Sequence, residues 1–278
     1  MTDLLERHVR AALDGDSAAL HELVVALKDD LYRLSLRMLG SPSDAQDATQ
    51  EILIKVVTHL KGYRAESSVR TWAWKIATRH LLRSRRKQCY QTTDFASLEA
   101  LIDAGATATP PTFDEREVHE LAEEVRLGCT QAMLSALKPA QRMVYVLADI
   151  FALESEVAAA VLSIDPATFR KRLQRARFEL AGFMERKCGL ANPAAACRCV
   201  RQIPIALDRR IIGRHRLKLA GQAREAISLP VRDAWEDLTS IDRAARVFQA
   251  RRNELAPAAI VSELRELISS GTFRLFEH

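Results

Sequence analysis

Basic side chains and a tryptophan are concentrated between residues 61 and 87. Nine lysines and arginines occur there against one acid, Glu66, so most of these bases lack an ion-pair partner within the segment. Four of them recur at steps of four, four and three residues: Lys75, Arg79, Arg83 and Arg86. Such a helical stripe beside Trp74 can neutralise phosphates while the indole stacks on a base, contributing about 1 to 3 kcal/mol per base. The segment favours a nucleic-acid ligand, although a solubilising face over a core tryptophan has the same spacing.

A cluster of cysteines near residue 190 is the second candidate for chemistry. Together with a histidine it offers four zinc ligands of the usual type: Cys188, Cys197, Cys199 and His215. The cysteine spacing is not that of a standard zinc knuckle, so buried or redox-sensing thiols remain the alternative. The five cysteines of the chain are an odd number without a small-domain disulfide pattern, and reduced thiols are expected.

Enzyme motifs are missing from the sequence. It contains no glycine-rich phosphate loop and no zincin motif, and its seven histidines form no pair at ligand spacing. We therefore expect no catalytic activity and no cofactor other than the zinc considered above.

The distribution of charge is more informative than its sum. The net charge is +5 over 278 residues, but the basic segment is followed by residues 88–128, with nine acids against two bases. Such blocks of opposite charge indicate that the two segments have separate functions. The N-terminal residues carry acids where a signal peptide needs bases, and no apolar run reaches about 18 residues, so we expect a cytoplasmic protein without membrane insertion.

Two helices are predicted before the basic segment. Apolar residues at steps of three and four predict the first from Ser17 to Leu39, and Ser43 is expected to cap the second, which runs to Leu60. The outer face of the second helix mixes acids and amides with an apolar Ile54. Spacing alone is compatible with a solvated face or with a docking surface for another protein.

A helix-turn-helix is predicted near residue 165. Residues 156–161 form a short helix, and Asp165 caps a second helix whose first residue is Pro166. Polar and basic side chains lie on its outer face, where they can read base edges in the major groove. The predicted fold is all-α, with two helical modules joined by an acidic linker.

The two modules together carry a family resemblance. The stretch from Asp44 to Leu82 resembles the second conserved region of bacterial sigma-70 family factors, and the stretch from Leu137 to Arg177 resembles their fourth. Because the long third region is missing, the resemblance is to the extracytoplasmic-function (ECF) group. It covers about residues 15 to 185.

The resemblance implies partners and contact residues. The partners would be core RNA polymerase, through the clamp helices of its large subunit, promoter DNA and, as a further candidate, an anti-sigma factor. The polymerase would contact Asp44, Asp47, Gln50, Glu51 and Ile54. The minus-ten element would contact Tyr63, Arg64, Glu66, Ser67, Ser68, Arg70, Trp72, Trp74, Lys75 and Arg79. The minus-thirty-five element would contact Thr168, Arg170, Lys171, Gln174, Arg175 and Arg177.

The expected domain organisation follows from these assignments. Residues 1–88 form the region 2 domain, 89–116 an acidic flexible linker with at most short helical pieces, and 117–187 the region 4 helix-turn-helix domain. Residues 188–278 form a mostly helical extension, for which we expect a regulatory role. The expected function is recognition of both promoter elements and melting of the DNA. The alternative is a helix-turn-helix regulator that acts without being a polymerase subunit.

Overall fold

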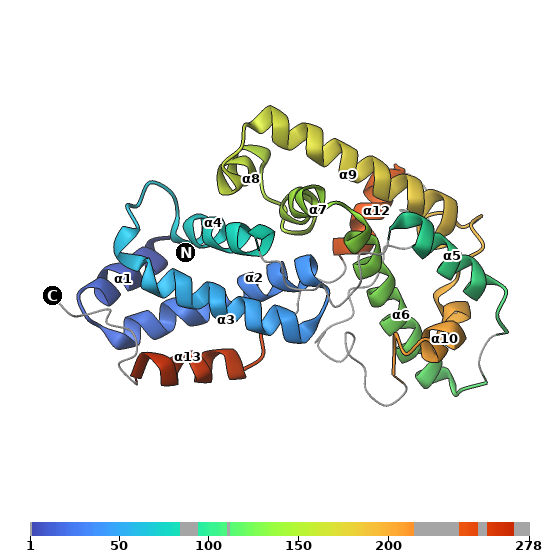
Figure 1. The fold of residues 1–278 in the computed structure, drawn as a ribbon, viewed down its shortest axis with the longest axis horizontal. Coiled ribbons are helices and arrows are strands. Elements are labelled where there is room, and N and C mark those ends of the chain that lie inside the picture. The colour runs from blue at the N-terminus through green and yellow to red at the C-terminus, as the bar shows by residue number, and fades with distance from the viewer. Residues whose placement is uncertain (1, 84–93, 110–111, 214–238, 250–254, 270–278) are drawn as a thin grey trace.

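The computed structural model describes residues 2–83, 94–109, 112–213, 239–249 and 255–269. These residues are helical apart from turns, loops and one isolated β-bridge between Cys188 and Cys197, which confirms the all-α prediction (Figure 1). The elements are α1 (Thr2–Leu13), α2 (Ser17–Leu39), α3 (Pro42–Thr58), η1 (Leu60–Gly62), α4 (Val69–Arg83), α5 (Phe95–Ala106), α6 (Glu115–Ala136), α7 (Pro139–Tyr145), η2 (Val146–Ile150), α8 (Ser155–Leu162), α9 (Pro166–Lys187), α10 (Cys199–Asp208), α12 (Ser240–Gln249) and α13 (Ala259–Ser269). No helix among the described residues is long and apolar enough to span a membrane.

Helices α1 to α4 form the N-terminal module, in which α2 packs against α1, α3 and α4. The turn between α2 and α3 depends on Gly40, which adopts φ +79° and donates its N–H to the carbonyl of Leu36. The cap of α3 is Ser41, whose Oγ accepts from the Asp44 N–H, and Pro42 occupies the first turn. The prediction of Ser43 as the cap was therefore wrong, because a proline that follows one helix also suits the first turn of the next.

Helices α6 to α9 form the second module, and the predicted helix-turn-helix is present in it. Ser163 ends α8 in the left-handed conformation, with φ 55°. Asp165 then caps α9 by accepting from the N–H of Thr168 at 2.9 Å, and Pro166 lies in the first turn. Before α8 the chain makes a π-helical turn over Val146–Ile150.

The segment between the modules is more ordered than predicted. Helix α5 has 12 residues and packs against α6, α9 and α10, with Leu98 and Ile102 buried. Lys187 of α9 anchors it from outside through Glu99 at 2.7 Å and Asp103 at 2.9 Å. The expectation of at most short helical pieces was therefore wrong, because packing against α6, α9 and α10 stabilises this helix.

The two modules meet at the C-terminal end of α2. Arg142 of α7 is fully buried and donates to the carbonyls of Met38 at 2.6 Å and Ser135 at 2.7 Å. Gln131 of α6 donates to the carbonyl of Arg37 at 3.1 Å. The last carbonyls of a helix have no partner within it and carry its negative dipole end, so a buried guanidinium satisfies them well. Burial lowers the pKa of Arg142 to about 10, which leaves it charged at neutral pH.

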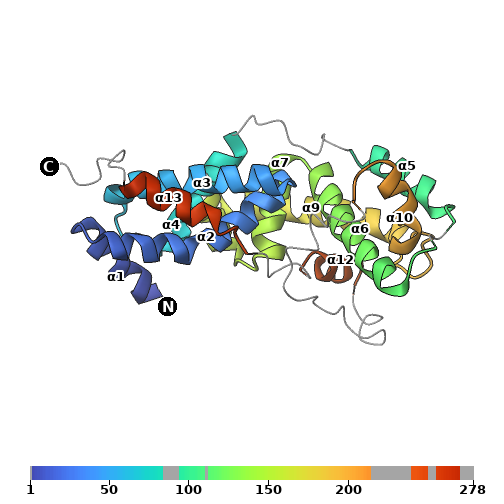
Figure 2. The ribbon, with the colours of Figure 1, turned by 90° about the horizontal axis from the view of Figure 1, so that it is seen from below.

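The C-terminal extension returns to both modules. Helix α10 packs on α5 and α6, α12 packs on α9 and η2, and α13 packs on α2 and α3. Figures 1 and 2 show α13 along the N-terminal module and α12 beside α9. The described helices of the extension are thus part of the folded body.

Replacing Arg142 with methionine should lower the free energy of unfolding by about 3 to 5 kcal/mol, because carbonyl groups from two helix ends would remain buried without donors. Urea titration followed by circular dichroism measures this change. The control is Arg116→Met, where the arginine side chain is 88% exposed and the change should stay within about 0.5 kcal/mol. Equal effects of the two substitutions would contradict the role assigned to Arg142.

Candidate nucleic-acid and polymerase interface

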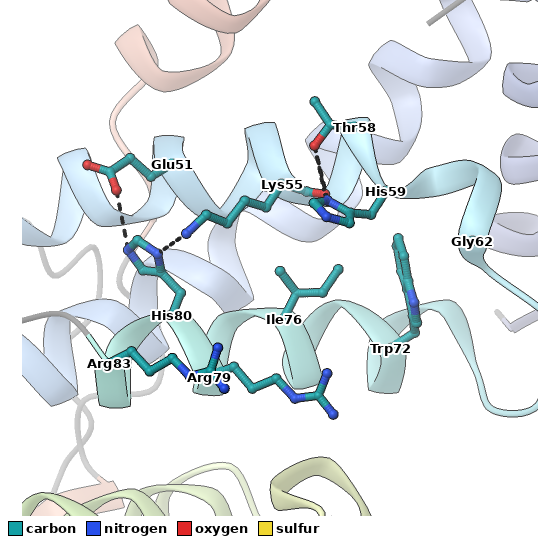
Figure 3. A pocket seen from close by; sticks show the side chains of 10 residues that line it. All are labelled: Glu51, Lys55, Thr58, His59, Gly62, Trp72, Ile76, Arg79, His80 and Arg83. Atoms are coloured by element: carbon teal, nitrogen blue, oxygen red, sulfur yellow. Dashed lines mark hydrogen bonds and ion pairs between the residues drawn. The ribbon is translucent and has the colours of Figure 1, made fainter.

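An open groove between α3 and α4 brings two of the predicted DNA contacts, Trp72 and Arg79, together with Arg83 of the predicted basic stripe (Figure 3). Its volume is about 890 Å³. The lining is basic and aromatic: Glu51, Lys55, Thr58, His59, Gly62, Trp72, Ile76, Arg79, His80 and Arg83. Cationic side chains beside an indole provide phosphate neutralisation and base stacking in one place. Arg86 of the predicted basic stripe lies outside the described residues.

A polar contact joins the two walls of this groove. The Nζ atom of Lys55 lies 2.6 Å from Nδ1 of His80, and Nε2 of the same ring lies 3.6 Å from a carboxylate oxygen of Glu51. Because an ammonium group can only donate, Nδ1 of His80 accepts from Lys55. Glu51, predicted to contact polymerase, therefore also faces α4, whereas Asp47 is exposed on the outer face of α3.

The loop between α3 and α4 is preorganised by its own side chains. Tyr63 donates its hydroxyl to the carbonyl of Ser67 at 2.7 Å, and its ring centre lies 5.5 Å from that of Trp72. Burial, followed by the charge of Glu6, raises the pKa of Tyr63, so the phenol stays protonated. Ser68 then accepts from the N–H of Thr71 at the start of α4. Arg64 and Glu66 are exposed at the loop tip.

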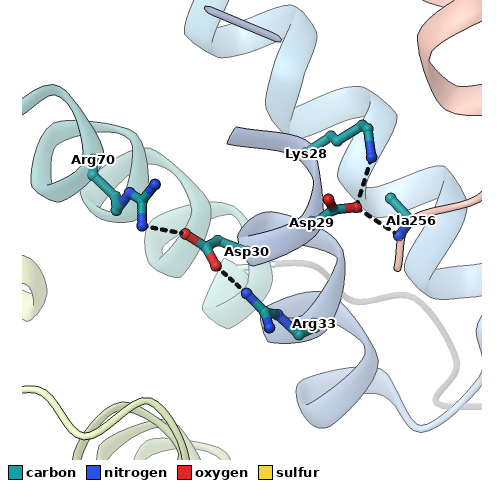
Figure 4. A network of polar contacts seen from close by, with 6 residues as sticks. All are labelled: Lys28, Asp29, Asp30, Arg33, Arg70 and Ala256. Carbon is teal, nitrogen blue, oxygen red and sulfur yellow. Dashed lines mark hydrogen bonds and ion pairs between the residues drawn. The ribbon is translucent and has the colours of Figure 1, made fainter. Parts of the chain in front are cut away.

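Arg70, another predicted DNA contact, is held by the N-terminal module. It lies 3.1 Å from Asp30 of α2, which also pairs with Arg33 (Figure 4). The Arg70 side chain remains 39% exposed. Its position at the start of α4 is thereby fixed while part of the guanidinium remains accessible.

Trp74 is not available to a base in this arrangement of the modules. It is 5% exposed, and its ring lies edge-on to Phe151 of the second module with the centroids 4.8 Å apart. Arg79 of the same helix donates to Ser163 in the helix-turn-helix at 3.3 Å. The predicted stacking of Trp74 therefore needs correction, because α8 covers this face of α4.

The outer face of α9 presents most of the predicted major-groove contacts. Lys171, Gln174 and Arg175 are exposed, and Thr168 is half-buried at the start of the helix. Arg170 is exposed as well, with an ion pair to Glu156 of α8 at 3.3 Å. Basic and amide side chains thus line the part of α9 nearest the turn.

Arg177 of α9 forms an ion pair with Asp149 of η2, whose carboxylate is buried. Its Nε lies 2.9 Å from Asp149 Oδ2, and this hydrogen bond raises the pKa of the arginine. In the described arrangement Arg177 therefore anchors η2 while its side chain remains 39% exposed, and its contact with the minus-thirty-five element stays a prediction. Phe178, which the sequence analysis did not single out, is 76% exposed on the same helix.

The cysteines of the extension line a cavity of about 510 Å³ with a fourth thiol, that of Cys129 from α6. Burial raises the pKa of all four thiols, to about 11 for Cys197 and about 12 for Cys199. Within the described part of the chain no three His, Cys, Asp or Glu side chains are placed to hold a metal ion. His215 lies outside that part, so the four-ligand zinc site stays a prediction.

Comparison with known proteins agrees with this geometry. The model of Sigma-70 region 2 matches residues 23–89, and that of Sigma-70, region 4 matches residues 127–180. The chain is 30% identical over 137 residues to the RNA polymerase sigma factor YlaC of Bacillus subtilis, covering 49% of this chain and 75% of YlaC. This chain belongs to the sigma-70 family, in its ECF group. Members of the family are in general non-catalytic specificity factors that bind DNA.

Two further ECF sigma factors cover more of the chain. The match to SigE of Mycolicibacterium smegmatis is 31% identical over 179 residues and covers 61% of this chain but only 64% of SigE. SigW of Bacillus subtilis is 26% identical, with 64% of this chain and 95% of SigW covered. A co-crystal structure of the sigma factor RpoE with the anti-sigma factor NepR from Bartonella quintana matches at 18% identity and a TM-score of 0.40, covering 59% of this chain and 92% of RpoE. Neither family model extends over the C-terminal extension of this sigma factor.

Replacing both Arg79 and Arg83 with alanine should weaken binding of single-stranded minus-ten DNA by the sigma factor in complex with core polymerase. Loss of two phosphate contacts should also reduce the slope of log affinity against log salt by about 1.4. Fluorescence anisotropy at several salt concentrations measures both quantities. Arg201→Ala, at an exposed position of α10, serves as control. An unchanged salt slope in the double variant would show that the groove does not bind phosphates.

Alkylation of Cys197 and Cys199 should be slow in the sigma factor. With a pKa of about 11, only about 0.1% of Cys197 is thiolate at pH 8, against roughly a quarter of an ordinary cysteine. Iodoacetamide labelling followed by mass spectrometry should show a rate that is at least 100-fold below that of a model thiol and rises about tenfold per pH unit. Addition of a zinc chelator should leave the rate unchanged if burial alone protects these thiols; an acceleration would instead support the zinc prediction.

Proposed function

We propose that this chain is a promoter-specificity subunit that binds core RNA polymerase, recognises minus-ten and minus-thirty-five elements and promotes melting of the DNA. The groove between α3 and α4 is the observation that carries this proposal. It brings Trp72, Arg79 and Arg83 of α4 to one groove, and Trp72 also contacts Tyr63 of the preorganised loop. A regulator that only binds duplex DNA needs no such groove for unpaired bases.

The mechanism of melting is preferential binding. The chain itself carries no catalytic activity in this proposal, so it can open DNA only by binding the unpaired strand better than the duplex. Extruding a base costs a few kcal/mol of stacking and pairing, which contacts in the loop and groove offset. Loop residues 63–68 receive the base, while Trp72 and the cations of α4 hold the adjoining strand.

The outer face of α3 is proposed to dock the clamp helices of the polymerase large subunit. Asp47 is exposed there, with Asp44, Gln50, Glu51 and Ile54 half-buried beside it. An apolar side chain among acids and amides offers both contact area and directional hydrogen bonds. Binding to polymerase would place the chain in the cytoplasm, and an anti-sigma factor is a further proposed partner.

Replacing Asp47 and Gln50 with alanine should weaken binding to core polymerase about tenfold and lower promoter-dependent transcription, because both side chains lie on the proposed docking face. Titration of labelled chain with core enzyme and in vitro transcription measure the two effects. Glu115→Ala, which removes an exposed acid from the start of α6, is the matched control. Failure of the unmodified chain to assemble with core polymerase under any condition would refute the sigma-factor function.

A further inference from the structure

Helix α13 is attached to the N-terminal module by a specific set of contacts. Ile260 and Leu264 on one side of it are 0% and 1% exposed. Just before the helix, the N–H of Ala256 donates to Asp29 Oδ1 of α2 at 2.8 Å (Figure 4). Near its C-terminal half, Nη2 of Arg265 lies 3.0 Å from Nε2 of His21, also on α2. The helix thus has an apolar and a polar attachment to α2.

The position of α13 relative to the proposed docking face follows from helical geometry. Glu51 and Lys55 mark the side of α3 that faces α4, through His80. At 100° per residue, Asp47, Ile54 and Gln50 follow in that order around the outer surface, away from α4. Helix α13 packs on both α2 and α3, on the side of α3 away from α4 (Figure 1). The docking face is therefore bordered by α4 on one side and α13 on the other.

The width of the clamp helices decides whether they fit on α3 between α4 and α13. A single helix with its side chains is about 10 to 12 Å across, and packed helices lie about 8 to 10 Å apart. A pair of clamp helices is therefore roughly 20 Å wide and cannot rest on the outer stripe of α3 alone. A partner of this width that extends from the outer stripe of α3 away from α4 overlaps the surface of α2 and α3 that α13 covers.

We propose that α13 competes with the clamp helices of core polymerase for the surface formed by α2 and α3, so that the chain holds its own docking face partly closed. This inference rests on the sigma-factor function proposed above. Release of α13 is then a step in polymerase binding, and the surface it leaves is the one the polymerase occupies.

Helix α12 of the extension couples the release of α13 to the second module. Helix α12 is held there by Phe248, whose ring centre lies 5.4 Å from that of Tyr145, and by Gln249, which donates to the carbonyl of Asp149 at 2.8 Å. Only residues 250–254 separate α12 from the segment that leads into α13. Six peptide units span at most about 22 Å, so the modules cannot move far apart while both attachments persist. Separation of the modules would uncover Trp74. Separation would also favour release of α13, and release of α13 would favour separation.

The test compares two variants of α13 in the full chain. Ile260→Asp with Leu264→Asp places charges at the buried contacts, whereas Ser262→Asp adds a charge on an exposed side of the same helix. Titration with core polymerase should show at least tenfold tighter binding for the double variant and an unchanged affinity for Ser262→Asp. Equal affinity of the double variant and the unmodified chain would overturn the inference. Absence of binding by every chain would overturn the sigma-factor function itself.

A measurement on the unmodified chain guards against misfolding of the double variant. Hydrogen–deuterium exchange of residues 259–269 is compared between the free chain and its complex with core polymerase. Competition predicts that exchange becomes at least tenfold faster on binding, because α13 leaves α2 and α3. Equal or slower exchange in the complex would show that α13 stays in place and would overturn the proposal.

Discussion

A buried guanidinium that binds the ends of two helices holds this structure together. Arg142 satisfies the carbonyls of Met38 and Ser135, and so joins the last turn of α2 to the last turn of α6. The same joint brings α8 against α4, which places Phe151 over Trp74. Because a charge in the interior is tolerated only while its partners remain, the arrangement of the modules is specific. This polar contact and the packing of α8 on α4 together accompany the burial of Trp74.

Some of the surfaces proposed to bind DNA and polymerase are accessible, whereas others are covered by the chain itself. The groove between α3 and α4 and the outer face of α9 are accessible together. The side of α4 that carries Trp74 is covered by the helix-turn-helix, and α13 covers the flank of α3. In the proposed function, unpaired DNA and polymerase would compete with these contacts inside the chain, and the free energy of the contacts would set how readily the chain is recruited.

Local signals in the sequence predicted most of the helices but not their contacts. The cap at Asp165 was predicted correctly because Asp followed by Pro acts within a few residues of the chain. Helix α5 was missed although Phe95, Leu98 and Ile102 recur at steps of three and four residues, because the surrounding acids and prolines favoured a linker. The burial of Trp74 and the place of Cys129 beside the cysteines of the extension depend on residues far apart in the chain. A single sequence contains no signal for such contacts.

Because α13 is synthesised long after α2 and α3, the surface that it covers is exposed for a time on the ribosome. The ribosome completes α3 at Thr58 and must add more than two hundred residues before Ser269 ends α13. At about 5 to 20 residues per second this takes about 10 to 40 s, while N-terminal segments already fold. During that interval the surface of α2 and α3 lies uncovered on the nascent chain. Under the proposed competition, a newly made molecule would therefore pass through a period of open access to polymerase at the surface that the finished molecule holds partly closed.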